Sequence, residues 1–184
     1  EEAADDVDAQ ESLLEAMDEL NVLIGDWRAT PQRADPGDML EEPNWVWDFE
    51  TDPAQPALVM STNDSPYFRR VRLSYDVAAR EFTMTVDCID DQIRELRGAF
   101  EEAPTEFQRD DRRVHVTYKL TLNEVEPADE RDQWQIALNQ QDNNRYLVEL
   151  SRHRSDGYAR FDTINNQRQG TSFAQADDDY GERE

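Results

Sequence analysis

The chain has 184 residues and carries 43 acidic residues against 19 lysines and arginines, which gives a formal net charge of −24 at pH 7. This length fits one domain, and the 37% of hydrophobic residues suffice for a sizeable core. The charge argues against nucleic-acid partners, which need a basic surface, and against anionic membranes. No apolar run approaches the ~18 residues of a membrane-spanning helix, and Cys88 is the only cysteine, which excludes an internal disulfide.

The first part of the chain predicts a short helix. Residues 1–11 are acidic and are expected to be disordered. Ser12 and Glu15 have the spacing of a capping box, in which a serine at the N-cap precedes a glutamate three residues later. Apolar residues then recur at helical spacing up to Ile24, and Gly25 is expected to end the helix.

From residue 44 the hydrophobic pattern changes to alternation, and runs of alternating residues separated by turn-forming residues predict about ten strands. One face of each run is polar, which indicates a sheet with one wet face and one buried face. A sheet of this size tends to curl, and closure removes its exposed edges. We therefore predict an all-β fold: an up-and-down antiparallel barrel of about ten strands with an N-terminal helix at one mouth. A two-sheet sandwich is the alternative.

The helix and barrel are predicted to occupy residues 12–165, and residues 166–184 to form a polar acidic tail. The run from Leu20 to Trp27, placed after an amphipathic helix and before the strands, resembles the entry of the calycin group: lipocalins, fatty-acid-binding proteins and nitrobindin-like barrels. The resemblance implies that Gly25 and Trp27 have structural roles, and that the lipocalin-like barrel encloses a small ligand or a packed core.

The end of the chain carries a second resemblance. Residues 170–174 and the acidic stretch after them resemble the end of the barrel in exported, planctomycete-type bacterial proteins. Those proteins join a lipocalin-like barrel to a Cys-rich, metal-binding domain of the TRASH/YHS kind, whose cysteines are not among these 184 residues. The resemblance implies that residues 166–184 link the barrel to a further domain, and that the protein is exported to the periplasm or the cell exterior. An acid excess with Lys119 as the only lysine also suits a secreted, highly solvated surface.

Candidate ligand-binding residues are those that the alternation places inside the barrel. The aromatic ones suit either plain core or a pocket for a flat or lipid-like ligand. The charged ones suit either an internal network of arginines and acids or a pocket that holds a ligand's carboxylate. Asp162 has the same predicted inward parity as Arg160. The candidates are Trp45, Trp47, Arg69, Tyr75, Phe82, Glu95, Arg97, Tyr118, Trp134 and Arg160.

Cofactor and catalytic signals are weak. Nitrobindin-like barrels bind haem through a histidine, but His115 and His153 are both predicted to face outward. Two histidines on separate strands also lack the spacing of a zinc site, so neither a cofactor nor a metal is expected. The motifs Gly-x-Ser-x-Gly, Gly-x-Gly-x-x-Gly, His-Glu-x-x-His and the P-loop are absent from the sequence, and no catalytic carboxylate pair stands out among 43 acids.

We therefore expect a non-enzymatic, exported domain that binds a small, largely apolar ligand in the barrel. The alternative is a filled structural or interaction domain that accompanies a metal-binding or anchoring domain and has no ligand of its own. The sequence does not indicate an oligomeric state.

Overall fold

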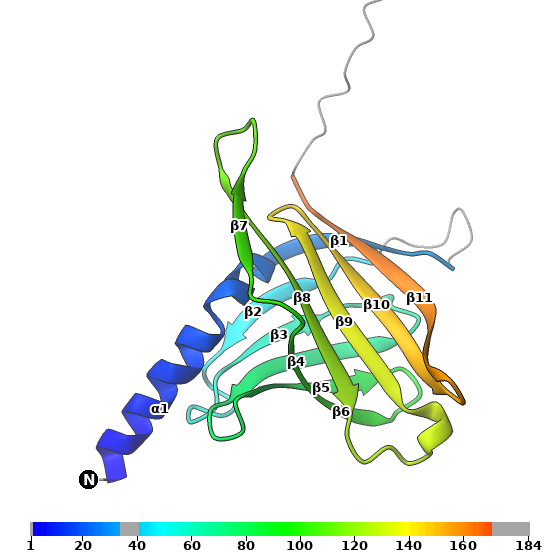
Figure 1. The fold of residues 1–184 in the computed structure, drawn as a ribbon, viewed down its shortest axis with the longest axis horizontal. Coiled ribbons are helices and arrows are strands. Elements are labelled where there is room, and N and C mark those ends of the chain that lie inside the picture. Colours follow the sequence, from blue (N-terminus) through cyan, green and yellow to red (C-terminus); the bar gives the residue numbers. More distant parts are fainter. Residues whose placement is uncertain (1, 34–40, 171–184) are drawn as a thin grey trace, which may run out of the picture.

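The computed structural model describes residues 2–33 and 41–170, with side chains from Asp8 onward. They form a closed antiparallel β-barrel of ten strands with one N-terminal helix (Figure 1). The predicted all-β barrel is confirmed, and the sandwich alternative is wrong because the sheet closes on itself. The wall consists of β1 (Gly25–Pro31), β2 (Asn44–Asp48), β3 (Ala57–Ser61), β4 (Phe68–Asp76), β5 (Glu81–Cys88), β6 (Ile93–Phe100), β8 (Val114–Glu124), β9 (Trp134–Asp142), β10 (Arg145–Arg154) and β11 (Gly157–Arg168).

Barrel closure depends on two pairings besides those between consecutive strands. β1 pairs with β11, where Trp27 lies opposite Arg168, and β6 pairs with β8, where Gly98 lies opposite Leu122. Between β6 and β8 the chain makes an excursion through β7 (Thr105–Gln108), which pairs with the first part of β8 and extends beyond the wall (Figure 1). Strand β7 was not predicted, because its four residues carry no clear alternation.

The seam between β6 and β8 requires a glycine. A Cβ atom at Gly98 would lie 1.9 Å from the carbonyl oxygen of Thr121 and 2.8 Å from the Cα of Leu122. Both are backbone atoms of the partner strand, so neither can move without parting the seam. Gly98 therefore permits the close approach that closes the barrel.

The helix begins earlier than predicted. α1 spans Glu2–Ala16, and a 3-10 helix, η1, follows at Asp18–Leu23. The Ser12 hydroxyl donates to the carbonyl of Asp8 at 2.9 Å, one turn back within the helix, so the prediction that Ser12 is the N-cap is wrong. The acidic segment before Ser12 is rich in alanine and glutamate, which favour helix and extend α1 toward the N-terminus.

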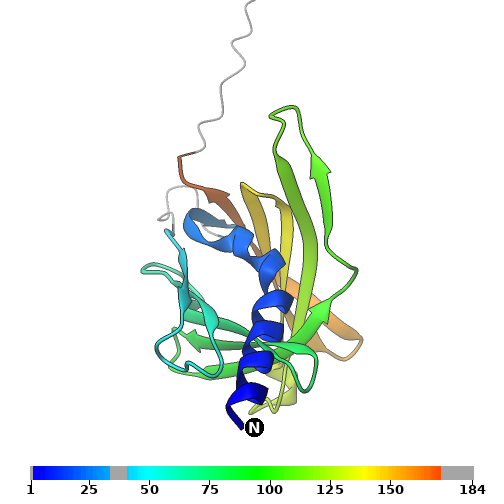
Figure 2. The same ribbon diagram turned by 90° about the vertical axis from the view of Figure 1, so that its left-hand side faces the viewer.

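The helical segment covers one mouth of the barrel. Leu13, Met17, Leu20 and Leu23 are buried and belong to the main hydrophobic cluster. Figure 2 looks at this mouth and shows α1 crossing it. Within the described ranges, no helix combines the length and apolar character that a bilayer span requires.

The junction between η1 and β1 is built around Trp27. Gly25 has φ +116°, a conformation that favours glycine, and it turns the chain into β1. The fully buried Trp27 indole donates from Nε1 to the carbonyl of Leu23 at 2.6 Å and meets Tyr146 edge-on, with ring centroids 4.7 Å apart. The Arg168 guanidinium lies 4.2 Å from the centroid of the Trp27 ring and donates to the carbonyl of Ile24 at 2.8 Å. The first and last strands are thus joined by side chains as well as by backbone.

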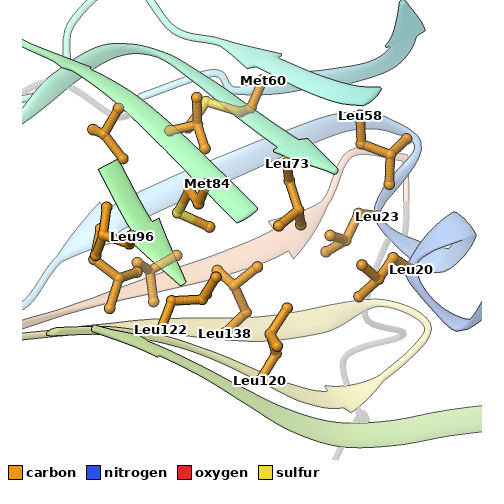
Figure 3. Packing of buried hydrophobic residues seen from close by; sticks show 14 of the residues in the cluster. Leu20, Leu23, Leu58, Met60, Leu73, Met84, Leu96, Leu120, Leu122 and Leu138 are labelled. Carbon is orange, nitrogen blue, oxygen red and sulfur yellow. The ribbon is translucent and has the colours of Figure 1, made fainter. Parts of the chain in front are cut away.

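Leucine and methionine side chains fill much of the barrel interior, together with aromatic and other aliphatic residues. Figure 3 shows them pointing toward one another from opposite sides of the wall, with those of η1 meeting them at the mouth. The labelled members are Leu20, Leu23, Leu58, Met60, Leu73, Met84, Leu96, Leu120, Leu122 and Leu138, all buried. Burial of this kind stabilises a fold by about 25 cal/mol per Å² of apolar surface.

Candidate functional site

An apolar pocket lies inside the barrel, between β2–β5 on one side and β9–β11 on the other. Its volume is about 20 Å³, which is room for about one water molecule. Ligand pockets usually measure hundreds of Å³, so this interior is packed in the conformation seen. The walls include Trp45, Met60, Phe68, Met84, Tyr146 and Ile164.

Glu41 is the one charged residue that lines this pocket among the described residues. It lies just before β2, and its backbone N–H and C=O pair with Ala29 of β1 at 3.1 and 2.8 Å. Its side chain is only 2% exposed, and within the described part of the chain its Oε1 atom has no hydrogen-bond partner. An unpaired buried polar atom costs roughly 1–3 kcal/mol, so Glu41 reduces the stability of the fold.

Burial also changes the protonation of Glu41. The pKa of the carboxyl is raised from 4.5 to about 7, mainly because burial removes it from water. A hydrogen bond with Ser65 opposes this rise, and the negative charges of Asp162 and Asp64 add to it. The carboxyl therefore titrates in the neutral pH range and not in the acidic range usual for glutamate. Sequence reasoning missed Glu41, because it lies in a proline-containing segment without alternation and next to a second acid, Glu42.

A phenol accompanies the carboxyl in the pocket. The hydroxyl oxygen of Tyr146 accepts a hydrogen bond from Nε1 of Trp45 at 3.0 Å, and both side chains are buried. Burial raises the pKa of the Tyr146 hydroxyl, and the nearby charge of Glu41 adds to that effect. The mainly apolar pocket thus presents a carboxyl and a phenol, together with the amide of Asn166.

Asp162 lies near Glu41 and is also buried, at 3% exposure. Its carboxylate accepts hydrogen bonds from the Tyr67 hydroxyl, from the backbone N–H of Thr163 at 2.7 Å and from the backbone N–H of Arg33 at 3.3 Å. The donors are neutral groups, so they satisfy the carboxylate without cancelling its charge. The two charged groups that act on Glu41, Asp162 and Asp64, are both acids.

The aromatic residues predicted to face the ligand divide into two groups. Trp45, Phe82, Tyr118 and Trp134 are buried, and Trp45 lines the pocket. Tyr75 and Trp47 are half-buried. Tyr75 packs edge-on against Phe82 at 5.0 Å between ring centroids, whereas Trp47 donates from Nε1 to Asn21 at 2.9 Å near the barrel mouth.

The inward placement predicted for Arg69, Glu95, Arg97 and Arg160 is wrong, since all four are exposed on the outer surface. Arg69 pairs with Asp91 at 2.8 Å, Arg97 with Asp76 at 3.2 Å and Arg160 with Glu149 at 2.5 Å.

These errors have local causes. On β6 the prediction took Ile93 as inward, yet Ile93 is 70% exposed, so the parity of the whole strand was inverted. β-bulges shift the register between Phe68 and Arg70, and between Leu150 and Ser151. A bulge adds one residue and reverses the faces beyond it. The inward parity predicted for Asp162 agrees with its burial.

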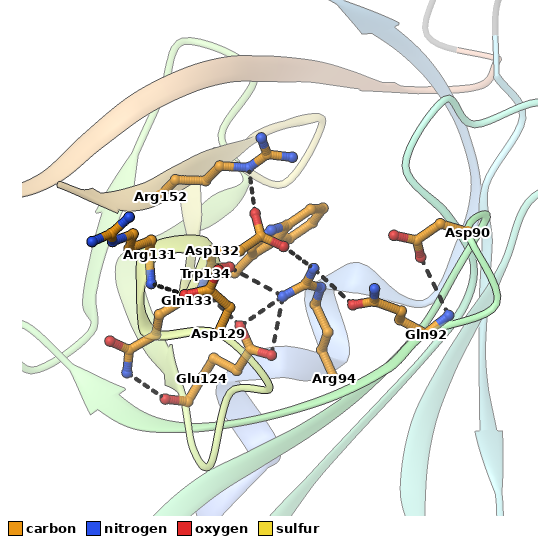
Figure 4. A network of polar contacts seen from close by, with 10 residues as sticks. All are labelled: Asp90, Gln92, Arg94, Glu124, Asp129, Arg131, Asp132, Gln133, Trp134 and Arg152. Atoms are coloured by element: carbon orange, nitrogen blue, oxygen red, sulfur yellow. Dashed lines mark hydrogen bonds and ion pairs between the residues drawn. The ribbon is translucent and has the colours of Figure 1, made fainter.

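An internal network of an arginine with acids does exist, but with other members. Arg94 is 4% exposed and donates from Nη1 to Glu124 at 2.9 Å and from Nη2 to Asp132 at 2.7 Å, as Figure 4 shows. Its guanidinium carbon lies 4.5 Å from the ring centroid of Trp134, whose backbone N–H donates to Glu124 at 2.8 Å. The network joins β6, β8 and β9 at one end of the barrel. The charged groups of the network pair with one another, so the network has a structural role in this conformation.

His115 shares parity with Thr117 and Lys119 and so lies on the outer face of β8, as predicted, but it is not exposed. His115 is 1% exposed, because the β7 arm covers it and Phe107 of that arm stacks on its ring at 5.5 Å. Nδ1 accepts from the backbone N–H of Asn143 at 3.3 Å, and Nε2 lies 3.1 Å from a carboxylate oxygen of Asp111. Both ring nitrogens are thus engaged by the protein. Across residues 8–33 and 41–170, no cluster of three or more histidine, cysteine, aspartate or glutamate side chains suits a metal ion.

The chain matches no protein-family model and none of the curated proteins. Its class is therefore defined by the structure alone: a closed, ten-stranded antiparallel barrel with a helix across one mouth, which is compatible with a calycin-like domain.

Proposed function

We propose that this protein is a non-enzymatic, exported domain of the calycin type that binds a small, largely apolar ligand inside the barrel. The observation that carries the proposal is the carboxyl oxygen Oε1 of Glu41, which has no hydrogen-bond partner among the described residues and lies in a mainly apolar pocket. A barrel selected only for stability would place an apolar side chain there. Unsatisfied buried groups in native proteins call for an explanation, and a ligand contact supplies one. Export is supported by the acidic composition and by the resemblance at the end of the chain.

The volume of the pocket limits the ligand. The space of about 20 Å³ must enlarge before anything bigger than a water can enter. Met60 and Met84 line the pocket, and methionine is unbranched and adapts its shape readily. The ligand would therefore be small, with a body of a few carbon atoms that displaces these side chains.

A pocket-filling variant tests the proposal. Val71→Leu adds one methylene group to a pocket wall, and Val46→Leu makes the same change on β2 at a position that is 48% exposed. We expect ligand-observed NMR to detect binding of small alcohols and amines by the wild-type protein and by Val46→Leu, and weaker binding by Val71→Leu. Equal binding by all three proteins would place the ligand outside the pocket.

The second candidate is a filled structural or interaction domain without a ligand, and the same small volume favours it. The two candidates differ in the wild-type result. If no compound of the panel binds the wild-type protein, the barrel is a filled domain and the ligand proposal fails.

A further inference from the structure

We infer that the pocket selects ligands with a protonated amine, whose ammonium group meets the unpartnered Oε1 of Glu41 while its carbon body lies among Trp45, Met60 and Met84. This inference rests on the proposed function and names the chemical class of the ligand. It is carried by the position of Glu41, which is 2% exposed and lines the pocket.

The charges around the pocket favour a cation. None of the described residues that line it is basic. The groups that act electrostatically on Glu41 are the acids Asp162 and Asp64. Two arginines are close enough to act on neighbouring tyrosines: Arg33 acts on Tyr67, and Arg168 on Tyr146.

These arginines do not occupy the place of a ligand cation. The Arg168 side chain donates to backbone carbonyls of Val22, Ile24 and Asn143, and its guanidinium lies over Trp27. Arg33 follows the end of β1, and its backbone N–H donates to Asp162 at 3.3 Å. Since neither residue lines the pocket, Oε1 remains available to a ligand.

An ammonium group fits the pocket better than other polar groups do. A carboxylate ligand would be repelled by Glu41 and Asp162, so a fatty-acid head group is disfavoured. An alcohol could donate one hydrogen bond to the ionised Oε1, whereas an ammonium group also carries a positive charge that compensates the buried negative charge of the carboxylate. The oxygen atoms of Tyr146 and Asn166, which also line the pocket, can accept the remaining ammonium protons.

The test compares three probes of nearly equal size: n-butylamine, n-butanol and butyrate. Binding is measured by ligand-observed NMR and by the intrinsic fluorescence of the four tryptophans, of which Trp45 lines the pocket, in 0.5 M sodium chloride to screen the net charge of −24. At pH 8.5, where both Glu41 and the amine are charged, we expect butylamine to bind at least about tenfold tighter than butanol, with butyrate weakest. At pH 5.5 the affinity for butylamine should fall toward that for butanol.

Two variants assign the effect to Glu41. Glu41→Gln has nearly the same shape and should lose the preference for amine over alcohol while still binding butanol. Glu42→Gln, an exposed neighbour, should behave as the wild-type protein. If amine and alcohol bind the wild-type protein equally, the inference fails and the proposed function stands. If no probe binds, Glu41 contacts a buried water only, and the proposed function fails with it.

Discussion

Replacing Glu41 by glutamine should abolish a pH dependence of stability that the wild-type protein has. The carboxyl has a pKa of about 7 in the folded protein and 4.5 as its ordinary value, mainly because it is buried. The folded state therefore binds the proton more tightly than the unfolded state. The resulting stabilisation is complete below pH 4.5, declines as the pH rises, and is lost above pH 7.

The size of this effect follows from the two pKa values. Between pH 5 and pH 8 the free energy of unfolding should fall by about 2–3 kcal/mol because of Glu41 alone. Glutamine does not titrate, so the Glu41→Gln protein should lack this component. At pH 8 the variant should be the more stable protein, because it has no ionised carboxylate in the apolar pocket.

Urea denaturation at pH 5 and pH 8 measures the effect, since urea is uncharged and permits a constant 0.5 M sodium chloride. For each protein, the change in the free energy of unfolding between pH 5 and pH 8 is measured. The difference between these two changes isolates Glu41, because the other titrating groups are common to both proteins. Glu42→Gln, at an exposed position, serves as the control and should follow the wild-type protein. Parallel pH profiles for wild type and Glu41→Gln would refute the assignment of a raised pKa to this residue.

Three further predictions concern the barrel as a whole. Gly98→Ala should lower stability by at least about 2 kcal/mol, because its Cβ would meet backbone atoms of β8. Gly157→Ala, at φ +117° but with open space around it, should cost about 1 kcal/mol. If thermal melts show Gly157→Ala to be the less stable of the two variants, the proposed geometry of the β6–β8 seam is wrong. Arg168→Lys keeps the charge but loses the planar guanidinium over Trp27, so the melting temperature should drop and tryptophan emission should shift; an unchanged spectrum would argue against this packing. Raising sodium chloride from 10 mM to 1 M should raise the melting temperature, since the Debye length falls from ~30 to ~3 Å; a flat response would mean that the arginines already neutralise the acids.

The barrel could be predicted from the sequence because its signal is repeated many times. Alternation along β5 and β8 gives the correct buried faces at Phe82, Met84, Tyr118 and Leu120. One wrong residue does not change that pattern, and closure then follows from the general instability of open sheet edges.

The candidate site could not be predicted in the same way, because it depends on single residues. Ile93 is hydrophobic but exposed. Because the prediction placed Ile93 inside the barrel, it assigned Glu95 and Arg97, which share its face of β6, to the wrong side of the wall. Arg94 lies on the same face of β6 as the buried Leu96. A buried arginine can be predicted only when its acidic partners are known, and the sequence does not show which acids lie beside it. Glu41 pairs with β1 through an isolated bridge, which leaves no periodic trace in the sequence.

The pairing of β1 with β11 has a consequence for how the chain folds. Strands that are neighbours in sequence can pair soon after they are synthesised, but β1 has to wait for the last strand of the barrel. Until then the growing sheet keeps two open edges that can pair with strands of other chains. The net charge of −24 gives nascent chains a mutual repulsion during this interval. We therefore expect the acidic surface to limit aggregation before the barrel closes.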